Sequence, residues 1–165
     1  MSAPGQIVPR PAVAADYEPL TLLFESRWHD AHGHCTPPEL VAARTRAHFH
    51  ARLLEFGDGL RVIGPEGAPE GFAAVKGDHV DQLYVSRALA GTGAALVLLR
   101  EAEARIAAAG HDEAVLDCNP GNARAAAFYR KSGWSPRGLE KVLLDTATGP
   151  FPFEVLVFTR RVAPD

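Results

Sequence analysis

The spacing of apolar positions changes several times along the chain, and the clearest change lies between residues 80 and 109. Val80, Leu83, Tyr84 and Val85 favour strands, so this stretch predicts a strand. After Gly91-Thr92-Gly93 the apolar residues recur with helical spacing, at Ala95, Leu98, Leu99, Ala102, Ile106 and Ala109. The polar face carries Glu101 and Arg105, which have the spacing of an ion pair. The pattern predicts a strand, a tight glycine loop and a long amphipathic helix in succession.

The segment before residue 60 is expected to form one strand and two helices. Residues 6–13 are apolar-rich but hold two prolines, which favours a short edge strand. Asp16 is a suitable N-cap for a helix that buries Leu20, Leu23, Phe24 and Trp28. Thr36 and Glu39 have the spacing of a capping box, with Pro37 at the first helical position. The second helix should end near Gly57 and bury Leu40, Ala43, Ala47, Ala51 and Leu54.

The rest of the chain predicts mainly strands. Residues 60–63 and 71–75 read as two strands around a turn, and Gly77-Asp78 is a hairpin signal before the strand that follows. Further strands are expected at 114–118, from Trp134 through 142–144, and at 153–159. Asn119-Pro120-Gly121 breaks the first of these, and Asn122 is placed to cap a short helix that Gly133 ends.

Composition narrows the class of protein. With 165 residues the chain is expected to form one domain, residues 1–165, which can bury a core without disulfides or metal. A net charge of -3 argues against a protein that binds nucleic acid through its overall charge. The two cysteines, Cys35 and Cys118, have no CxxC spacing, which indicates reduced thiols. Without an apolar run of membrane-spanning length or a signal peptide, the expected location is the cytoplasm.

The glycine loop indicates an anion site but does not identify it. Small residues at a helix N-terminus expose main-chain amides and the positive end of the helix dipole, which suits phosphate groups. The phosphate loop of nucleoside triphosphatases is disfavoured, because no Lys-Ser or Lys-Thr follows Gly93. A dinucleotide fold would place the unit first in a parallel series, whereas here it follows a hairpin.

Two motifs together resemble the GCN5-related N-acetyltransferase (GNAT) family. The strand Leu83-Tyr84-Val85 followed by Gly91-Thr92-Gly93-Ala94-Ala95 is similar to the family's acyl-CoA loop, and residues 122–134, NARAAAFYRKSGW, are similar to its second motif. The resemblance extends over essentially the full chain. It implies an α+β fold with α/β/α layers, in which about seven strands form a mixed, mostly antiparallel sheet with about four helices.

The resemblance also implies where acetyl-CoA binds. The central strand would part from its neighbour after Leu83, Tyr84 and Val85, and free main-chain groups there would hold the pantetheine and the thioester oxygen. The pyrophosphate would bind at Ala90, Gly91, Thr92, Gly93, Ala94, Ala95 and Leu96. The pantetheine arm would contact Asn119, Asn122, Ala125, Phe128 and Tyr129. Ala90 departs from the family pattern, which has Arg or Gln there, so one phosphate donor is missing unless Arg87 or Arg130 replaces it.

Tyr129 falls on the family's tyrosine position, which implies that its hydroxyl protonates the leaving thiolate; the alternative is a core aromatic beside Phe128. For the general base, regular strand alternation puts His79, Asp81 and Leu83 on one face and Tyr84 on the other. His79 and Asp81 are therefore the candidate bases, and polar residues of a hairpin turn are the alternative.

Three histidines, His29, His32 and His34, lie within six positions. They read as solvated loop residues or, with Cys35, as part of a metal site, although no complete ligand set is evident and no metal is expected. The family resemblance offers a third interpretation, in which Trp28, His29 and His32 line the acceptor pocket.

The sequence therefore predicts an acetyl-CoA-dependent N-acetyltransferase that acts directly, in a ternary complex, on a primary amine of a small molecule. A ping-pong route through Cys118 or Cys35 is the mechanistic alternative. A non-catalytic acyl-CoA binder and an NAD- or ATP-dependent enzyme are alternative functions. The expected partners are the small-molecule amine and, in a homodimer, a second copy of the chain, with neither nucleic acid nor membrane.

Overall fold

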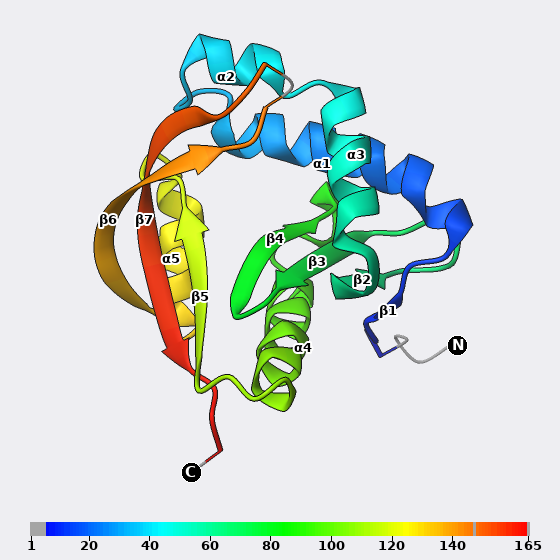
Figure 1. Ribbon diagram of the computed structural model, residues 1–165. Helices are drawn as coiled ribbons and strands as arrows, with labels where there is room; N and C mark the ends of the chain where they lie inside the picture. The colour runs from blue at the N-terminus through cyan, green and yellow to red at the C-terminus, as the bar shows by residue number, and fades with distance from the viewer. Residues whose placement is uncertain (1–5, 147, 165) are drawn as a thin grey trace.

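A sheet of seven strands organises the part of the chain that the computed structural model describes, residues 6–146 and 148–164 (Figure 1). Its strand order is β1-β2-β3-β4-β5-β7-β6, and every neighbouring pair is antiparallel except β4 and β5. The strands are β1 (Arg10–Pro11), β2 (Leu60–Ile63), β3 (Gly71–Lys76), β4 (His79–Val85), β5 (Glu113–Cys118), β6 (Ser135–Leu144) and β7 (Phe151–Arg161). This confirms the mixed, mostly antiparallel sheet and removes the parallel nucleotide-binding sheet as an alternative.

Five α-helices accompany the sheet in the described residues. They are α1 (Tyr17–His32), α2 (Pro38–Ala43), α3 (Arg46–Phe56), α4 (Ala94–Ala108) and α5 (Ala123–Lys131). None of these helices has both the length and the apolar character needed to cross a bilayer.

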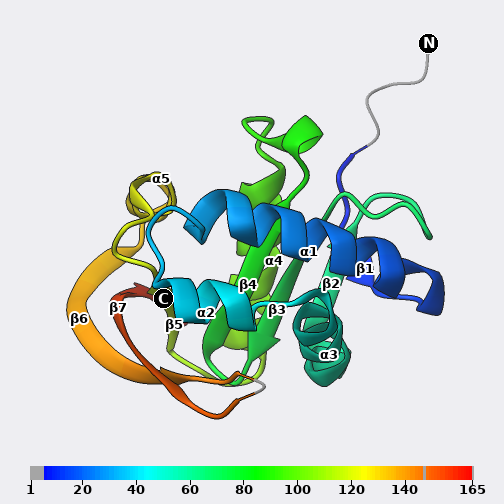
Figure 2. The ribbon, with the colours of Figure 1, turned by 90° about the horizontal axis from the view of Figure 1, so that it is seen from above.

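The helices cover both faces of the sheet (Figure 2). On one face, α1 and α3 pack against β2, β3 and β4 around Phe24, Phe49 and Phe72. On the other face, α4 and α5 pack around Leu99, Ile106 and Phe158. The layers agree with the expected α/β/α arrangement, because each helix has one apolar stripe that must be buried.

The parallel pair β4–β5 is held together at one end only. His79 pairs with Val115, whose N–H donates to the carbonyl of Asp78 at 2.9 Å, and no further residues of these strands pair. Beyond this point the strands diverge toward α1 and α2 (Figure 1). The separation was expected after Val85; it begins already after His79, so most of β4 and β5 present unpaired main-chain edges to each other.

The second predicted helix is in fact two helices, which is why the structure has five rather than about four. Arg44 and Thr45 interrupt it, and the Thr45 hydroxyl caps α3 by accepting from the His48 N–H at 3.2 Å. The interruption changes the buried face. The core residues of α3 are Phe49, Leu53 and Phe56, and the expected core residues Ala47, Ala51 and Leu54 are exposed.

Two of the expected capping interactions do not form, although Asp16 does occupy the N-cap position of α1, and in both cases the side chain makes other contacts. Thr36 does not cap α2, whose first residue is Pro38; its hydroxyl accepts from Asn119 at 3.1 Å. Asp16 makes no cap hydrogen bond to α1. It is fully buried, forms an ion pair with Arg10 at 2.7 Å and accepts from the N–H of Gly67 at 3.0 Å.

The strand–loop–helix unit and the short helix after it are confirmed. In α4 the predicted residues Leu98, Leu99, Ala102 and Ile106 are buried, whereas Ala109 lies beyond the helix and is exposed. Glu101 pairs with Arg105 at 2.7 Å, as expected. The Asn122 side chain caps α5 by accepting from the Ala125 N–H at 3.1 Å, and Gly133, at φ 90°, follows its end.

Candidate active site

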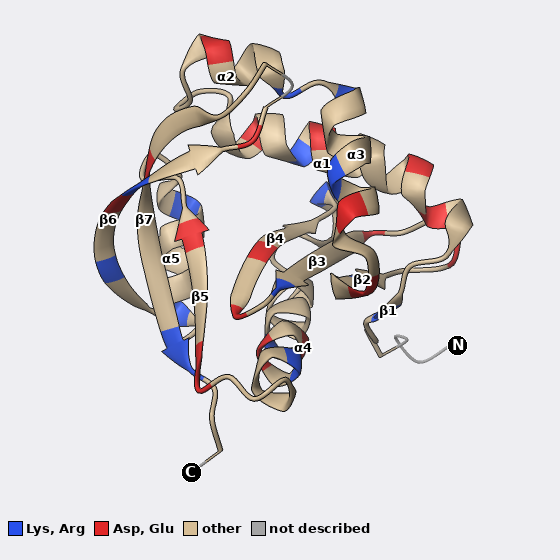
Figure 3. Ribbon diagram, viewed as in Figure 1, with Lys and Arg blue, Asp and Glu red and all other residues tan. Residues whose placement is uncertain are grey.

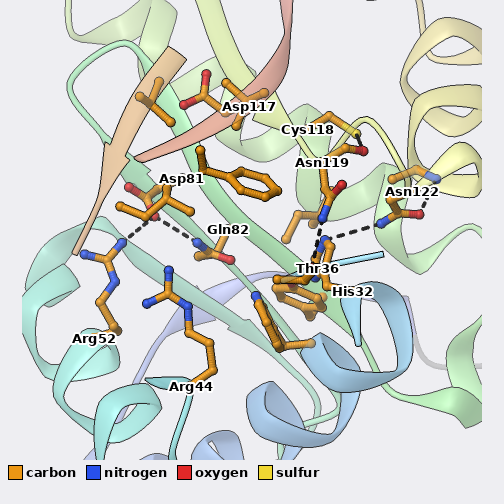
Figure 4. Close-up of a pocket in the computed structure, with 18 of the residues that line it drawn as sticks. His32, Thr36, Arg44, Arg52, Asp81, Gln82, Asp117, Cys118, Asn119 and Asn122 are labelled. Carbon is orange, nitrogen blue, oxygen red and sulfur yellow. Dashed lines mark hydrogen bonds and ion pairs between the residues drawn. The ribbon is translucent and has the colours of Figure 1, made fainter. Parts of the chain in front are cut away.

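A cavity of about 370 Å³ lies where β4 and β5 diverge. Its walls come from β4, β5, the helices α1 to α3, the first turns of α5 and the turn end of the β6–β7 hairpin. Figure 4 shows the polar side chains that project into it, with Asp81, Arg52 and Arg44 toward one end and Asn119, Asn122 and His32 toward the other. A volume of this size suits a small molecule.

A β-bulge in β4 decides which side chains face the cavity. Ala74 pairs with Gln82 but Val75 pairs with Val80, so Asp81 is the extra residue of the bulge. Asp81 and Gln82 consequently both lie on the side of α3. Tyr84 also lies there, with its ring 5.4 Å from that of Phe24, whereas Leu83 packs toward α4. The expected alternation, with Leu83 beside Asp81 and Tyr84 opposite, is therefore wrong.

His79 and Asp81 both line the cavity, and both already have partners. His79 is at the narrow end, half exposed, with its Nδ1 at 2.6 Å from the carboxylate of Asp78. Asp81 accepts from Arg52 at 2.8 Å and from the Gln82 amide at 3.2 Å.

Asp117 was missed by the sequence analysis. It lines the cavity from β5, and its carboxylate makes no hydrogen bond or ion pair with any described residue. Partial burial raises its pKa above the ordinary value, although His79 nearby opposes this shift. The signal available in the sequence was its position, since it is the one acid within the apolar run of residues 114–118.

Tyr129 projects from α5 into the cavity between three aromatic neighbours. Its ring lies 5.3 Å from that of Phe128, 5.8 Å from Phe158 and 6.3 Å from Trp134. Burial raises the pKa of its phenol well above the usual range, so the hydroxyl keeps its proton at neutral pH. Among the described residues its hydroxyl has no hydrogen-bond partner.

Two loops meet at one end of the cavity. Asn119 donates to Thr36, and the Asn122 amide lies 3.5 Å from Nε2 of His32, so the loop after β5 is joined to the end of α1 and the loop that follows it. Cys35 packs against Gly121, where an added Cβ would lie 2.4 Å from the Cβ of Cys35. Both asparagines and Ala125 line the cavity, whereas Phe128 does not.

The glycine loop lies outside this cavity and is open to ligand. Gly91 and Gly93 have φ of 76° and 89°, a conformation that favours glycine, and no atom lies within 4 Å of where a Cβ would stand on either. Gly93 precedes the first turn of α4, whose amides at Ala94, Ala95 and Leu96 have no partner within the helix. Thr92 closes the turn by donating to the carbonyl of Leu89.

The two arginines considered as substitutes for a donor at Ala90 are both engaged elsewhere. Arg87 donates to Asp30 of α1 through Nε at 3.0 Å, and the guanidinium of Arg130 lies 5.5 Å from the ring of Phe158.

The three histidines do not act together and do not share a loop: His29 and His32 belong to the last turn of α1, and only His34 lies beyond it and is exposed, so the expectation of three solvated loop residues is wrong. His32 lines the cavity with Trp28, and burial lowers its pKa to about 4. His29 is not part of the lining; its Nε2 is 3.2 Å from the carbonyl of Arg44. Within the described residues, no three His, Cys, Asp or Glu side chains come together as a metal site.

A basic wall faces the cavity from the junction of α2 and α3, and the sequence analysis missed it. Arg44, His48 and Arg52 line the cavity here. The signal was the Arg44-Thr45 pair, because Thr45 can cap a new helix and so turns Arg44 away from the continuous helical face.

The comparisons with known proteins agree with this architecture. A model of the acetyltransferase (GNAT) family matches residues 20–134. The solved structure of a GCN5-related N-acetyltransferase described as a class-II aminotransferase, from Rhodopseudomonas palustris, is 22% identical with a TM-score of 0.75, covering 98% of this chain and 99% of that one. No curated protein matches the sequence.

Two further structures contain the cofactor. A phosphinothricin acetyltransferase from Sinorhizobium meliloti, solved with acetyl-CoA, is 22% identical with a TM-score of 0.69, covering 96% of this chain and 90% of that one. The PaiA N-acetyltransferase from Thermoplasma acidophilum, in complex with coenzyme A, is 17% identical with a TM-score of 0.69, covering 95% of this chain and 99% of that one. At these identities the likeness is one of fold.

Proposed function

Since this chain belongs to the acetyltransferase (GNAT) family, we propose that it transfers the acetyl group of acetyl-CoA directly to a primary amine of a small molecule. The observation that carries the proposal is the divergence of β4 and β5 after the single pair His79–Val115, with a cavity at that point and the glycine loop at the start of α4.

The divergent strands support a site for the pantetheine. Main-chain N–H and C=O groups that lack a neighbouring strand need other partners, and the amide groups of pantetheine supply them. The pyrophosphate would lie on the amides of residues 91–96, where the helix dipole favours negative charge. Asn119 and Asn122 would contact the pantetheine arm from the other side.

The size of the cavity supports a small acceptor. The contact between the α1–α2 loop and the loop after β5, together with residues 142–145 of the β6–β7 hairpin, bounds the space proposed to hold the amine.

Tyr129 and Asp117 are suited to the two proton transfers. The amine nitrogen attacks the thioester carbonyl carbon and the C–S bond breaks; the sulfur then takes the proton of the Tyr129 hydroxyl. The proton lost by the amine goes to a base, for which Asp117 has a free carboxylate with a raised pKa. Asp81 and His79 are the other groups within this part of the cavity, and each is already held by a partner.

The state of Cys118 supports direct transfer over a ping-pong route. Burial raises the pKa of this thiol to about 11, so at neutral pH it is protonated and a poor nucleophile.

The test is CoA binding followed by thiol release. CoA at a hundred times its dissociation constant should stabilise the protein by about 2.7 kcal/mol, and acetyl-CoA with a panel of amines should release free thiol. An unchanged melting temperature at millimolar CoA would contradict the whole proposal. CoA binding without thiol release from any amine would leave only a binding function.

A further inference from the structure

Arg44 is placed to bind a charged group inside the cavity. It lies between α2 and α3. Figure 4 shows its guanidinium pointing into the cavity, beside the guanidinium of Arg52 and the amide of Gln82. Its Nη1 donates to the main-chain carbonyl of Asp145 at 2.6 Å and lies 2.7 Å from Nε2 of His48.

The hydrogen-bond partners of Arg44 hold its position without forming an ion pair with it, although the carboxylate of Asp145 acts on it from a longer distance. A carbonyl is neutral, and burial lowers the pKa of His48 to about 4, so that imidazole is neutral at physiological pH and accepts the hydrogen bond. Among the described residues, no carboxylate lies within ion-pair distance of Arg44. Arg52 differs, because Asp81 at 2.8 Å and Glu55 at 3.3 Å both pair with it.

A partly buried charge without a counter-ion is unfavourable. Burial lowers the pKa of Arg44, which reflects the desolvation of its guanidinium. An anionic ligand would relieve this. The Nε and Nη2 atoms have no partner among the described residues, and together they form the edge of a guanidinium that matches the two oxygens of a carboxylate.

The charges at the two sides of the cavity are opposite. The basic wall of Arg44 lies on the α2–α3 side, the unpaired carboxylate of Asp117 comes from β5, and Phe24, Phe49 and Tyr84 line the space as well. A ligand that carries both an amino group and an acidic group would satisfy both.

We propose that the acceptor is an amine that also carries a carboxylate or a similar oxyanion, as in an α-amino acid with an apolar side chain, and that Arg44 binds this group. The inference rests on the proposed acetyl transfer and specifies its acceptor. It makes Arg44 a determinant of specificity for the acidic group of the acceptor, separate from the groups that move protons.

The test compares acceptors that differ only in the charged group. L-leucine, L-leucinamide and 3-methylbutylamine form one series, and L-phenylalanine, L-phenylalaninamide and phenethylamine form another. With acetyl-CoA saturating, the amino acid should have a kcat/KM at least tenfold above the amide and the amine. Arg44→Met should abolish that preference through a higher KM for the amino acid, with the KM for acetyl-CoA unchanged.

The matched control is Arg46→Met on α3, since Arg46 is exposed, pairs with Glu25 at 3.1 Å and does not line the cavity. It should keep the preference. Equal rates for amino acid, amide and amine overturn the inference, as does a preference that survives Arg44→Met. If CoA still stabilises the protein but no standard amino acid is acetylated better than its amide, the inference fails alone. If CoA does not bind, the proposed function fails first.

Discussion

At the scale of single residues, Tyr129 combines a protonated hydroxyl with a position on the cavity wall. Tyr129→Phe removes the hydroxyl and leaves the ring between Phe128, Phe158 and Trp134. If the hydroxyl protonates the leaving thiolate, turnover should fall on the order of ten- to a thousandfold while CoA affinity changes little. Steady-state kinetics and calorimetry measure the two effects. Full turnover, with chemistry shown to limit the rate, would make Tyr129 a structural residue.

The choice of general base can be made by pH dependence. Asp117 must be ionised to accept a proton, so with its raised pKa the rate should decline as pH falls through that value. Asp117→Asn should lower kcat/KM by about a hundredfold or more at neutral pH, remove this decline, and recover partly at high pH, where free amine is available. The pH–rate profiles of Asp81→Asn and His79→Ala provide the comparison. If either of these variants loses the decline of the rate at low pH and Asp117→Asn retains it, the assignment of the base to Asp117 is wrong.

Asp16 shows how one buried carboxylate links stability to pH. Its ion pair with Arg10, helped by the N–H groups of Val13 and Gly67, lowers its pKa from 3.8 to about 2. Because the folded-state pKa is below the unfolded one, the stabilisation is fully present above about pH 4 and is lost as pH falls toward 2. The difference corresponds to ~2 kcal/mol. Asp16→Asn should lower the free energy of unfolding, measured in urea at pH 7, by that amount. The control Asp58→Asn, at an exposed position, should leave the free energy of unfolding unchanged.

At the scale of elements, the loop before α4 can be tested against the loop after it. Gly93 and Gly110 both have positive φ, 89° and 96°, and both have open space where a side chain would stand. Aspartate should therefore strain the backbone similarly at either position. Only Gly93→Asp adds a negative charge where the pyrophosphate is proposed to bind, so it alone should abolish the CoA-dependent rise in melting temperature. An equal loss in Gly110→Asp would show that the effect is not local.

The sequence predicted elements well where one local signal was strong. Gly91 and Gly93 marked the start of α4, Asn122 the start of α5, and Gly77-Asp78 the hairpin, because each depends on the conformation or capping of a few neighbouring residues. The bulge at Asp81 could not be predicted in this way. It is a mismatch of register between two strands, and regular alternation gave the wrong partners for Leu83 and Tyr84.

The candidate site was predicted to the extent that it follows from the family motifs. Tyr129, Asn119 and Asn122 do line the cavity, and so do His79, Asp81, Trp28 and His32. Asp117 and Arg44 were missed. Neither forms an ion pair with a described residue, and this depends on what surrounds them in space rather than on their sequence neighbours.

At the scale of the whole molecule, acidic and basic residues are interspersed over the helices (Figure 3). The molecule's larger feature is the unpaired interval between β4 and β5. CoA should slow hydrogen exchange in residues 79–85 and 113–118, because the pantetheine would bond to their main chain. Mass spectrometry of these peptides measures the effect, with β2 as an internal reference. Protection confined to the start of α4 would contradict binding between the strands.

The single pair His79–Val115 also affects how substitutions combine. The core around Phe24, Phe49 and Phe72 belongs to the first four strands, and the core around Val115, Val155 and Val157 belongs to the last three. These two cores share no residue, and the halves are joined through the separate core under α4, which includes Val80 of β4 and Leu116 of β5. Substitutions taken one from each of the two cores should therefore combine nearly additively. Coupled changes are expected under α4 and along the cavity, where both halves bind the same ligand.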